Sequence, residues 1–258
     1  MTFSIITICY NSEKTIERTL KSVLNQSYKD YEYIIVDGAS SDSTNDIVKK
    51  YEPLFEGRMK WQSEPDKGIY NAMNKGIKRA TGTIVGIVNS DDWLEPNALS
   101  VVFDAYNQNN RDKNTLYCGG INYCDISGKV KQMPVNYKAF KRQVSLYVMS
   151  GIRHPATFVP MDVYMKIGLF NEKMKLSADQ DFVLRCYYGG VSFCEINHIL
   201  SNMAGGGIST DGSQASLEAS IHDRKIMLSE FGFRGFKFYW LYYSWRLKLL
   251  IIKTILAK

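Results

Sequence analysis

Polar side chains of the kinds that bind nucleotides and metal ions recur at four places in the first hundred residues. The clusters cover residues 10–13, 37–42, 64–68 and 89–92, each directly after an apolar, strand-like run. A carboxylate in such a place, here Asp37, can accept hydrogen bonds from a base or a ribose. The adjacent Asp91 and Asp92 offer hard oxygen ligands, which suit Mg²⁺ or Mn²⁺ bound together with phosphates. Lys67 can add a positive charge near those phosphates.

Each cluster also has a purely structural interpretation. An aspartate that follows a strand is often a turn former or a helix cap, so Asp37 alone decides nothing. Asp91 and Asp92 precede the segment WLEP and could open a helix instead of binding a metal ion. The coincidence of four polar clusters at four matching strand ends favours one shared site.

Alternating strand and helix patterns would bring these clusters together. The sequence predicts strands over 3–9, 33–36, 59–62 and 83–88, and helices over 12–24, 43–51 and 69–80. Ser12 is expected to cap the first of these helices, and Ser43 with Asp46 resembles a capping box for the second. Such alternation indicates βαβ units and a mostly parallel sheet, whose ligands bind beyond the carboxyl ends of the strands.

The pattern changes after about residue 113. Strand-like runs at 116–125, 129–133 and 156–160 alternate with turns, and a helix over 178–188 precedes a strand over 191–200. Helical patterns follow over 216–231 and 236–256. We therefore expect an α/β fold in three parts, with a first half over 1–112, a second half over 113–210 and a C-terminal helical extension over 211–258.

Together these segments resemble glycosyltransferase family 2. The matching pieces are SIITICYN, VDGASSDST, EPDKGIYNAMNKGIKRATG and IVNSDDWLEP, followed by HPATF at 154–158, GLFNE at 168–172 and SADQDF at 177–182. The resemblance spans about residues 3–190. Within the family, the chain is similar to the branch that assembles bacterial exopolysaccharide, capsule or O-antigen. The resemblance implies the GT-A fold, in which a Rossmann-like sheet is flanked by helices, and a donor-binding first half that precedes an acceptor-binding, catalytic second half.

The resemblance also implies roles in binding the nucleotide, the metal ion and the acceptor. The expected nucleotide-binding residues are Tyr10, Asn11, Glu13, Asp37, Asp66, Lys67, Asn89 and Ser90. Asp91 matches the metal-binding aspartate of the family's DXD motif and Asp92 follows it, so Mn²⁺ or Mg²⁺ is the expected cofactor. The first position of that motif is Asn89 instead of aspartate, which predicts weaker metal binding. His154 is expected either to contact the acceptor or the departing phosphate, or to be structural.

Asp179 matches the general base of the family, with Asp181 as the alternative. The base would take a proton from the acceptor hydroxyl while that oxygen attacks the anomeric carbon, which inverts its configuration. General-base assistance is typically worth about 10²–10⁴ in rate. In the structural interpretation both acids only open the helix over 178–188, where negative charge favours the dipole.

Composition limits the setting and the partners. The hydrophobic fraction of 45% is ample for a core. The net charge of +6 comes from the segment that starts at Arg224, which contains eight basic residues and one acidic residue. Five cysteines without a CxxC pair favour a reduced, intracellular setting, and neither a signal peptide nor an apolar run of about 20 residues is found. We expect a cytoplasmic protein whose aromatic, basic segment 236–258 contacts the inner face of the membrane, packs on the domain or joins two copies.

The expected partners are a nucleotide-sugar donor, of which a UDP-sugar is the usual one, and a saccharide or lipid-linked acceptor, but no nucleic acid. The leading alternative is a protein of the same fold that binds a nucleotide or carbohydrate without catalysis. A nucleotidyltransferase would need a glycine- and arginine-rich loop at 10–15, and a nicotinamide dehydrogenase would need GxGxxG after the first strand. The chain contains neither.

Overall fold

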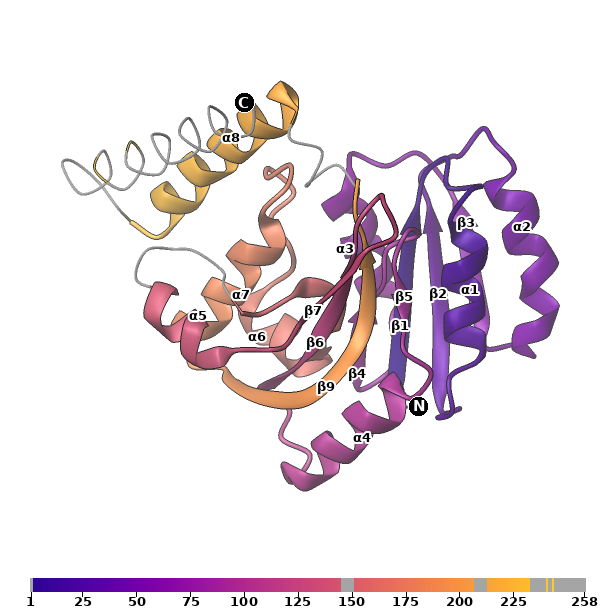
Figure 1. Cartoon of the computed structure of the whole chain (residues 1–258), viewed down its shortest axis with the longest axis horizontal. Coiled ribbons are helices and arrows are strands. Elements are labelled where there is room, and N and C mark those ends of the chain that lie inside the picture. Colours follow the sequence, from indigo (N-terminus) through magenta and orange to yellow (C-terminus); the bar gives the residue numbers. More distant parts are fainter. Residues whose placement is uncertain (1, 145–150, 207–212, 233–239, 241–242, 244–258) are drawn as a thin grey trace.

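The computed structural model describes residues 2–144, 151–206, 213–232, 240 and 243. Within them, one sheet has the strand order β3-β2-β1-β4-β8-β6-β9-β5, with β7 paired to β6 (Figure 1). The strands are β1 (Phe3–Cys9), β2 (Tyr31–Asp37), β3 (Met59–Ser63), β4 (Ile84–Ile87), β5 (Trp93–Leu94), β6 (Thr115–Cys124), β7 (Val130–Met133), β8 (Thr157–Pro160) and β9 (Ser192–Ala204). The helices are α1 (Ile16–Leu24), α2 (Thr44–Tyr51), α3 (Ile69–Arg79), α4 (Ala98–Gln108), α5 (Tyr137–Gln143), α6 (Met161–Ile167), α7 (Ala178–Tyr188) and α8 (Gln214–Glu230).

Parallel pairing is confined to two parts of the sheet. β1 pairs in parallel with β2 and β4, and β2 with β3, as the βαβ pattern predicts. Beyond β4 the sheet becomes mixed, because β8 is antiparallel to both β4 and β6, while β6 is parallel to β9. The predicted α/β sheet flanked by helices is confirmed, and its strictly parallel part is the first four strands in chain order.

Each face of the sheet buries its own apolar core. Consecutive residues of β1 point to opposite faces, so Ile5 packs with Leu20 of α1 on one side and Ile6 packs with Ile77 of α3 on the other. Figure 1 places α1 and α2 at the end of the molecule that carries β1–β3, and α5–α7 at the opposite end. The carboxyl ends of β1, β2 and β4 lead into the polar clusters.

Neither predicted serine forms a side-chain hydrogen bond that caps its helix, although Ser43 does occupy the N-cap position of α2. Helix α1 begins at Ile16, four residues after Ser12, and the Ser12 Oγ atom lies 2.8 Å from the Ser90 Oγ atom. Helix α2 begins at Thr44, whose backbone N–H donates to the carboxylate of Asp42 at 3.0 Å. The Ser12 contact joins residues 78 positions apart, which a local pattern does not reveal, whereas the Asp42 contact lies within a single turn.

The C-terminal extension is described only in part. Helix α8 runs from Gln214 to Glu230, and the Ser213 side chain accepts a hydrogen bond from Ser216 N at its start. Of the aromatic helix predicted over 236–256, Trp240 and Tyr243 are described, and the rest lies outside the described residues. In the part of the chain that the structure describes, no helix is both long and apolar enough to cross a membrane.

Candidate active site

The loops after β1 and β2 bind each other. Asn11, which has a left-handed backbone conformation (φ 47°), donates its N–H to Ser40 Oγ at 2.8 Å. Its side-chain oxygen accepts from Ser41 N at 2.9 Å. Ala39 is also left-handed (φ 64°), an uncommon conformation for a residue with a side chain. Such conformations cost free energy and cluster at functional sites, where the surrounding structure holds them in place. These two predicted nucleotide-binding loops therefore form one unit.

Glu13 strengthens the same junction. Its N–H donates to Asp42 Oδ2 at 3.1 Å, and its carboxylate accepts from Ser43 N at 3.1 Å. Glu13 is exposed, but both interactions are with the turn that starts α2. The structure thus places Glu13 beside the predicted nucleotide pocket as a residue that holds the loop.

Asp37 is buried at the end of β2 and is bound on all sides. Its carboxylate accepts hydrogen bonds from Ser40 N, Ser40 Oγ, Ser63 Oγ, Asn45 Nδ2 and Cys9 Sγ. A carboxylate has about four acceptor positions, so these donors occupy them. Burial alone would raise the pKa of Asp37, but the hydrogen bonds from Ser40 and Ser63 outweigh burial and lower it. Direct binding of a base by Asp37 is therefore disfavoured, and the residue instead fixes the loop that follows it.

Asp66 and Tyr10 meet above Gly38. A Cβ atom added to Gly38 would lie 2.6 Å from Asp66 Oδ2 and 3.4 Å from a ring carbon of Tyr10, so only glycine leaves room for both. The other oxygen of Asp66 accepts from Gly68 N at 2.8 Å. Tyr10 is 64% exposed, which leaves its ring free for a flat ligand. Lys67 is exposed next to Asp66, at the start of α3.

The segment after β4 is tied to α1. The hydroxyl of Thr19 lies 3.5, 3.0 and 2.6 Å from the carbonyl oxygens of Asn89, Ser90 and Asp92. Arg18 donates to the carbonyl oxygen of Asp91 at 2.7 Å, and its guanidinium stacks 3.6 Å from the ring centre of Trp93. This anchoring fixes the backbone of the DXD-like segment.

Asp91 and Asp92 lie in different surroundings. Asp92 is 2% exposed, and its carboxyl group accepts from Ala204 N at 3.0 Å and contacts the Asn89 amide at 3.5 Å. Burial, and then the charge of Asp91, raise the pKa of Asp92 to about 8. Because this carboxyl group is buried and its oxygens face Ala204 N and the Asn89 amide, it leaves little room for a cation. The expected metal role of Asp92 is therefore disfavoured, and Asp92 instead joins this segment to β9.

Asp91 fits a divalent cation better. It is half-buried, and the neighbouring Asn89 has a buried side-chain oxygen without a hydrogen-bond partner among the described residues. A carboxylate and an amide oxygen are hard donors that suit Mg²⁺ or Mn²⁺. No group of three His, Cys, Asp or Glu side chains that could hold a metal ion occurs in the described part of the chain. A cation held by these two residues would take its further ligands from phosphate oxygens and water.

Asp179 lies at the start of α7, where α3 meets it. The hydroxyl of Tyr70 contacts Asp179 Oδ1 at 3.4 Å, and Tyr70 is itself only 5% exposed. Burial, and then the charge of Asp179, raise the pKa of Tyr70 well above its ordinary value, so the phenol stays protonated and can donate. Burial lowers the pKa of His154, while the charge of Asp179 opposes that effect. The structure thus brings Tyr70, His154 and Asp179 together.

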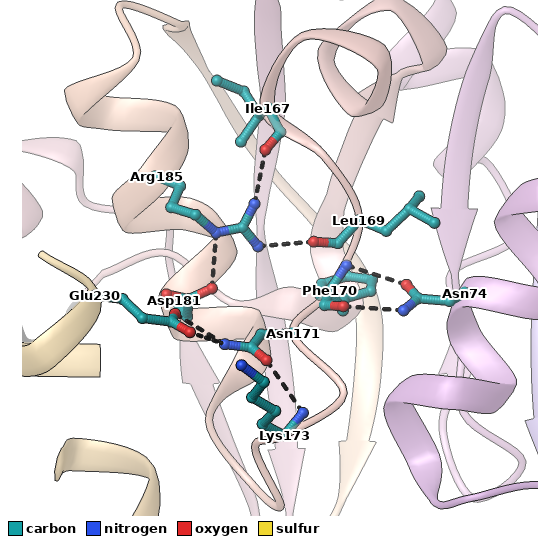
Figure 2. A network of polar contacts seen from close by, with 9 residues as sticks. All are labelled: Asn74, Ile167, Leu169, Phe170, Asn171, Lys173, Asp181, Arg185 and Glu230. Atoms are coloured by element: carbon teal, nitrogen blue, oxygen red, sulfur yellow. Dashed lines mark hydrogen bonds and ion pairs between the residues drawn. The ribbon is translucent and has the colours of Figure 1, made fainter. Parts of the chain in front are cut away.

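Asp181, the alternative base, faces the interior. It is fully buried and forms an ion pair with Arg185 at 2.8 Å. Figure 2 shows the Arg185 guanidinium between this carboxylate and the carbonyl oxygens of Ile167 and Leu169, which it binds at 2.9 and 2.8 Å. An acceptor hydroxyl cannot reach such a group, so Asp181 is disfavoured as the base.

Three residues of the site received no role from the sequence. Tyr70 lies inside the segment EPDKGIYNAMNKGIKRATG, so the resemblance pointed to its position without giving it a function. Arg18 and Thr19 lie on α1, and their partners are 73 and 70–73 residues further along the chain. A pattern that is read within one element cannot find such contacts.

Comparisons with known proteins agree on one family. The family model for glycosyl transferase family 2 matches residues 4–165. An uncharacterized glycosyltransferase of Mycobacterium tuberculosis is 31% identical over 186 residues, which cover 71% of this chain and 68% of that protein. A PGL/p-HBAD biosynthesis glycosyltransferase of Mycobacterium bovis is 30% identical over 202 residues, with 77% and 74% covered.

Solved structures share the fold. Staphylococcus aureus TarS 1-349 in complex with UDP-GlcNAc superposes with a TM-score of 0.69 at 23% identity, over 89% of this chain and 66% of that one. A mannosyltransferase of Pyrobaculum calidifontis in complex with GDP-Man and Mn²⁺ gives 0.62 at 15% identity, over 92% and 66%. The chain spans 39% of the longer TarS chain. At these identities the likeness concerns the fold.

Proposed function

This chain belongs to glycosyl transferase family 2, and we propose that it transfers a sugar from a nucleoside diphosphate donor to an acceptor hydroxyl with inversion at the anomeric carbon. It is a glycosyltransferase with the GT-A fold. One observation carries the proposal. Helix α3 starts two residues after Lys67, at the end of the loop that carries Asp66 and Lys67, and its second residue, Tyr70, contacts Asp179. A donor bound over this loop would lie within one helical turn of a carboxylate that can act as a base.

Asp179 would act as the general base. The carboxylate would take the proton of the acceptor hydroxyl, and the hydroxyl oxygen would form a bond to the anomeric carbon. The bond between that carbon and the phosphate oxygen would break, and its electron pair would leave with the nucleoside diphosphate. Tyr70 would orient the Asp179 carboxylate, and the neutral His154 ring would lie beside the acceptor or the departing phosphate.

Asp91, with the amide oxygen of Asn89, would hold Mn²⁺ or Mg²⁺. Bound there, the cation supplies positive charge that stabilises the departing diphosphate. Lys67 would add a second positive charge from the opposite loop. Tyr10, Asn11, Asp66 and Ser90 would line the nucleotide pocket, in which Asp37 and Glu13 hold the loops in place.

The comparisons support a sugar nucleotide as donor. TarS was solved with UDP-GlcNAc and the mannosyltransferase with GDP-Man, and one relative is named for PGL/p-HBAD biosynthesis. We propose a UDP-hexose or UDP-N-acetylhexosamine as donor and a saccharide or lipid-linked saccharide as acceptor, in the synthesis of a bacterial surface polysaccharide. Residues 1–112 would bind the donor and 113–210 the acceptor, on the cytoplasmic side of the membrane.

A thermal-shift panel tests the donor side. UDP, GDP, dTDP and their sugars are each added with and without Mn²⁺, to the wild type and to Asp91→Ala. Binding at a hundredfold excess over Kd stabilises the fold by about 2.7 kcal/mol, which is readily measured. We expect a shift with one nucleotide that depends on Mn²⁺ and is lost in Asp91→Ala. If no nucleotide shifts the wild type, the proposal is wrong; a shift without donor hydrolysis or transfer would identify a binding protein that lacks catalysis.

A further inference from the structure

A buried carboxylate of α8 binds the backbone directly before α7. Asp223 is fully buried, and its carboxylate accepts hydrogen bonds from the N–H groups of Lys175, Leu176 and Ser177 at 2.8, 2.6 and 2.9 Å. Bonds between a charged acceptor and several consecutive backbone N–H groups are among the stronger hydrogen bonds in proteins. His222 Nδ1 lies 3.2 Å from the same carboxylate and is half-exposed.

These three N–H groups immediately precede the helix that carries Asp179. Helix α7 begins at Ala178, so Ser177 is its N-cap and Asp179 is its second residue. A displacement of the segment 175–177 would move the Asp179 carboxylate away from Tyr70, because the first turn of α7 continues directly from it. The charge of Asp223 also contributes to the raised pKa of Tyr70, after burial and the charge of Asp179.

Residues 169–171, which precede this segment, form hydrogen bonds with side chains of three helices. Asn74 of α3 binds both the N–H and the carbonyl group of Phe170, at 3.0 and 2.9 Å. Arg185 of α7 binds the carbonyl oxygen of Leu169 at 2.8 Å. The Asn171 amide lies 2.9 and 2.8 Å from the two carboxylate oxygens of Glu230 at the end of α8 (Figure 2). Helix α8 thus holds the segment 171–177 at both of its ends.

We propose that Asp223 is a positioning residue of the transfer reaction, which fixes the start of α7 so that Asp179 faces the acceptor. Helix α8 lies beyond residues 4–165, the part of the chain that matches the family model, and it would belong to the catalytic unit nonetheless. The inference rests on the proposed role of Asp179 as the base. The start of the C-terminal extension would then have a role in catalysis, in addition to any role of the extension in membrane binding or oligomerisation.

Hydrogen exchange tests the anchor itself. Asp223→Ala and Asp223→Asn are compared with the wild type and with Glu218→Gln, a control that removes an exposed charge from the same helix. We expect amide exchange in a peptide covering 172–182 to become at least about tenfold faster in both Asp223 variants, because opening of this segment no longer breaks three hydrogen bonds. Exchange in the control should match the wild type. If exchange in the Asp223 variants is also unchanged, the anchor does not exist.

Steady-state kinetics test its role in catalysis. We expect kcat per folded molecule to fall about tenfold or more in Asp223→Asn, while the KM for the donor changes less than about twofold. The Mn²⁺-dependent shift with the nucleotide should remain. A purely structural role would lower the folded fraction and leave kcat per folded molecule unchanged, which would overturn the proposal. If Asp223→Ala does not fold, Asp223→Asn, which keeps the side-chain shape and one acceptor oxygen, decides alone.

The two proposals can fail separately. If the wild type transfers no sugar from any donor, the proposed function fails, while the exchange experiment still decides whether Asp223 anchors the segment. If the wild type transfers sugar and Asp223→Asn does so equally well per folded molecule, only the positioning role is wrong.

Discussion

Two aspartates on the first turn of α7 have surroundings that suit different tasks. Asp179 is half-buried and contacts the Tyr70 hydroxyl, whereas Asp181 is fully buried against Arg185. A general base must be accessible to the acceptor, as Asp179 is. A buried, hydrogen-bonded ion pair such as that of Asp181 contributes instead to the rigidity of the fold. The spacing of two residues on one helix therefore separates a candidate catalytic group from a structural one.

Substitution of each aspartate should have a different effect. Asp179→Asn should lower kcat by about 10²–10⁴ with the nucleotide-dependent thermal shift intact, because only the proton acceptor is lost. Asp181→Asn should lower the free energy of unfolding by on the order of 1–3 kcal/mol, because it removes a charged partner of Arg185. Transfer assays and urea unfolding separate the two effects. An Asp179→Asn enzyme with wild-type kcat would exclude Asp179 as the base.

Gly38 offers a second test at the scale of single residues. In Gly38→Ala the new Cβ atom would lie 2.6 Å from Asp66 Oδ2, so the Asp66 side chain must move. We expect nucleotide affinity to fall by roughly tenfold, or about 1.4 kcal/mol, measured by calorimetry. Gly57→Ala is the control, because Gly57 is left-handed (φ 82°) with no atom within 4 Å of an added Cβ. That variant should lose stability but keep its affinity; equal affinity in both variants would contradict the placement of Asp66.

At the scale of elements, the sequence predicted most strands and helices but not how their ends are joined. The apolar run of β1 and the apolar stripe of α3 are local signals, and both elements form where they were predicted. Ser12 and Ser43 match local cap signals, yet the Ser12 side chain pairs with Ser90, and Asp42 instead of Ser43 accepts a hydrogen bond from the first N–H group of α2. The contact of Ser12 depends on packing between loops, which local propensity does not encode.

In the candidate site, too, the sequence predicted the residue types but not the contacts between distant residues. The residue types after β1, β2 and β4 predicted a polar site at one edge of the sheet, and these segments do meet there. Burial distinguishes Asp91 from Asp92, and the sequence gives no sign of it because the two residues are adjacent. The contacts of Asp223 escaped detection for another reason, since its three backbone partners lie 46–48 residues away.

Glu32 of β2 joins several elements and should control stability in acid. Its buried carboxylate accepts from Ser4 Oγ at 2.7 Å, Thr81 N at 2.6 Å and Lys60 Nζ at 3.1 Å. Burial would raise the pKa of Glu32, but these hydrogen bonds outweigh burial and lower it to about 2. Because the folded pKa lies below the unfolded value of 4.5, the stabilisation is complete above pH 4.5 and is lost as the pH falls towards 2.

Glu32→Gln should remove this dependence. At pH 7 we expect the variant to be less stable by about 1–3 kcal/mol, because Lys60 and Thr81 lose a charged acceptor. The difference from the wild type should shrink between pH 4.5 and 2, since the wild-type carboxylate becomes protonated there. Urea unfolding at a series of pH values measures both curves. A constant difference down to pH 2 would show that the charge of Glu32 contributes nothing.

At the scale of the whole molecule, one sheet connects the proposed donor and acceptor halves. β4 of the first half pairs with β8 of the second, and β5 of the first half pairs with β9, whose last residue, Ala204, binds Asp92. Helix α3 adds a link through Tyr70 and Asn74 to the segment that carries Asp179. The two halves therefore share their packing at the site, which suits a reaction that needs donor and acceptor held in fixed geometry.

The basic C-terminal segment leads to a prediction about where the molecule acts. Residues 236–258 contain five basic and no acidic residues, together with aromatic side chains such as Trp240 and Trp245. Near an anionic membrane each Lys or Arg contributes about 1 kcal/mol of attraction, and aromatic rings favour the interface. We expect the full chain to sediment with vesicles containing phosphatidylglycerol, and a chain that ends at residue 232 to stay in solution. Raised salt should weaken the binding, because these charges are screened.

The nucleotide-dependent thermal shift of the truncated chain serves as the control of folding and should be unchanged. Equal sedimentation of the two chains would show that the segment packs on protein instead of lipid.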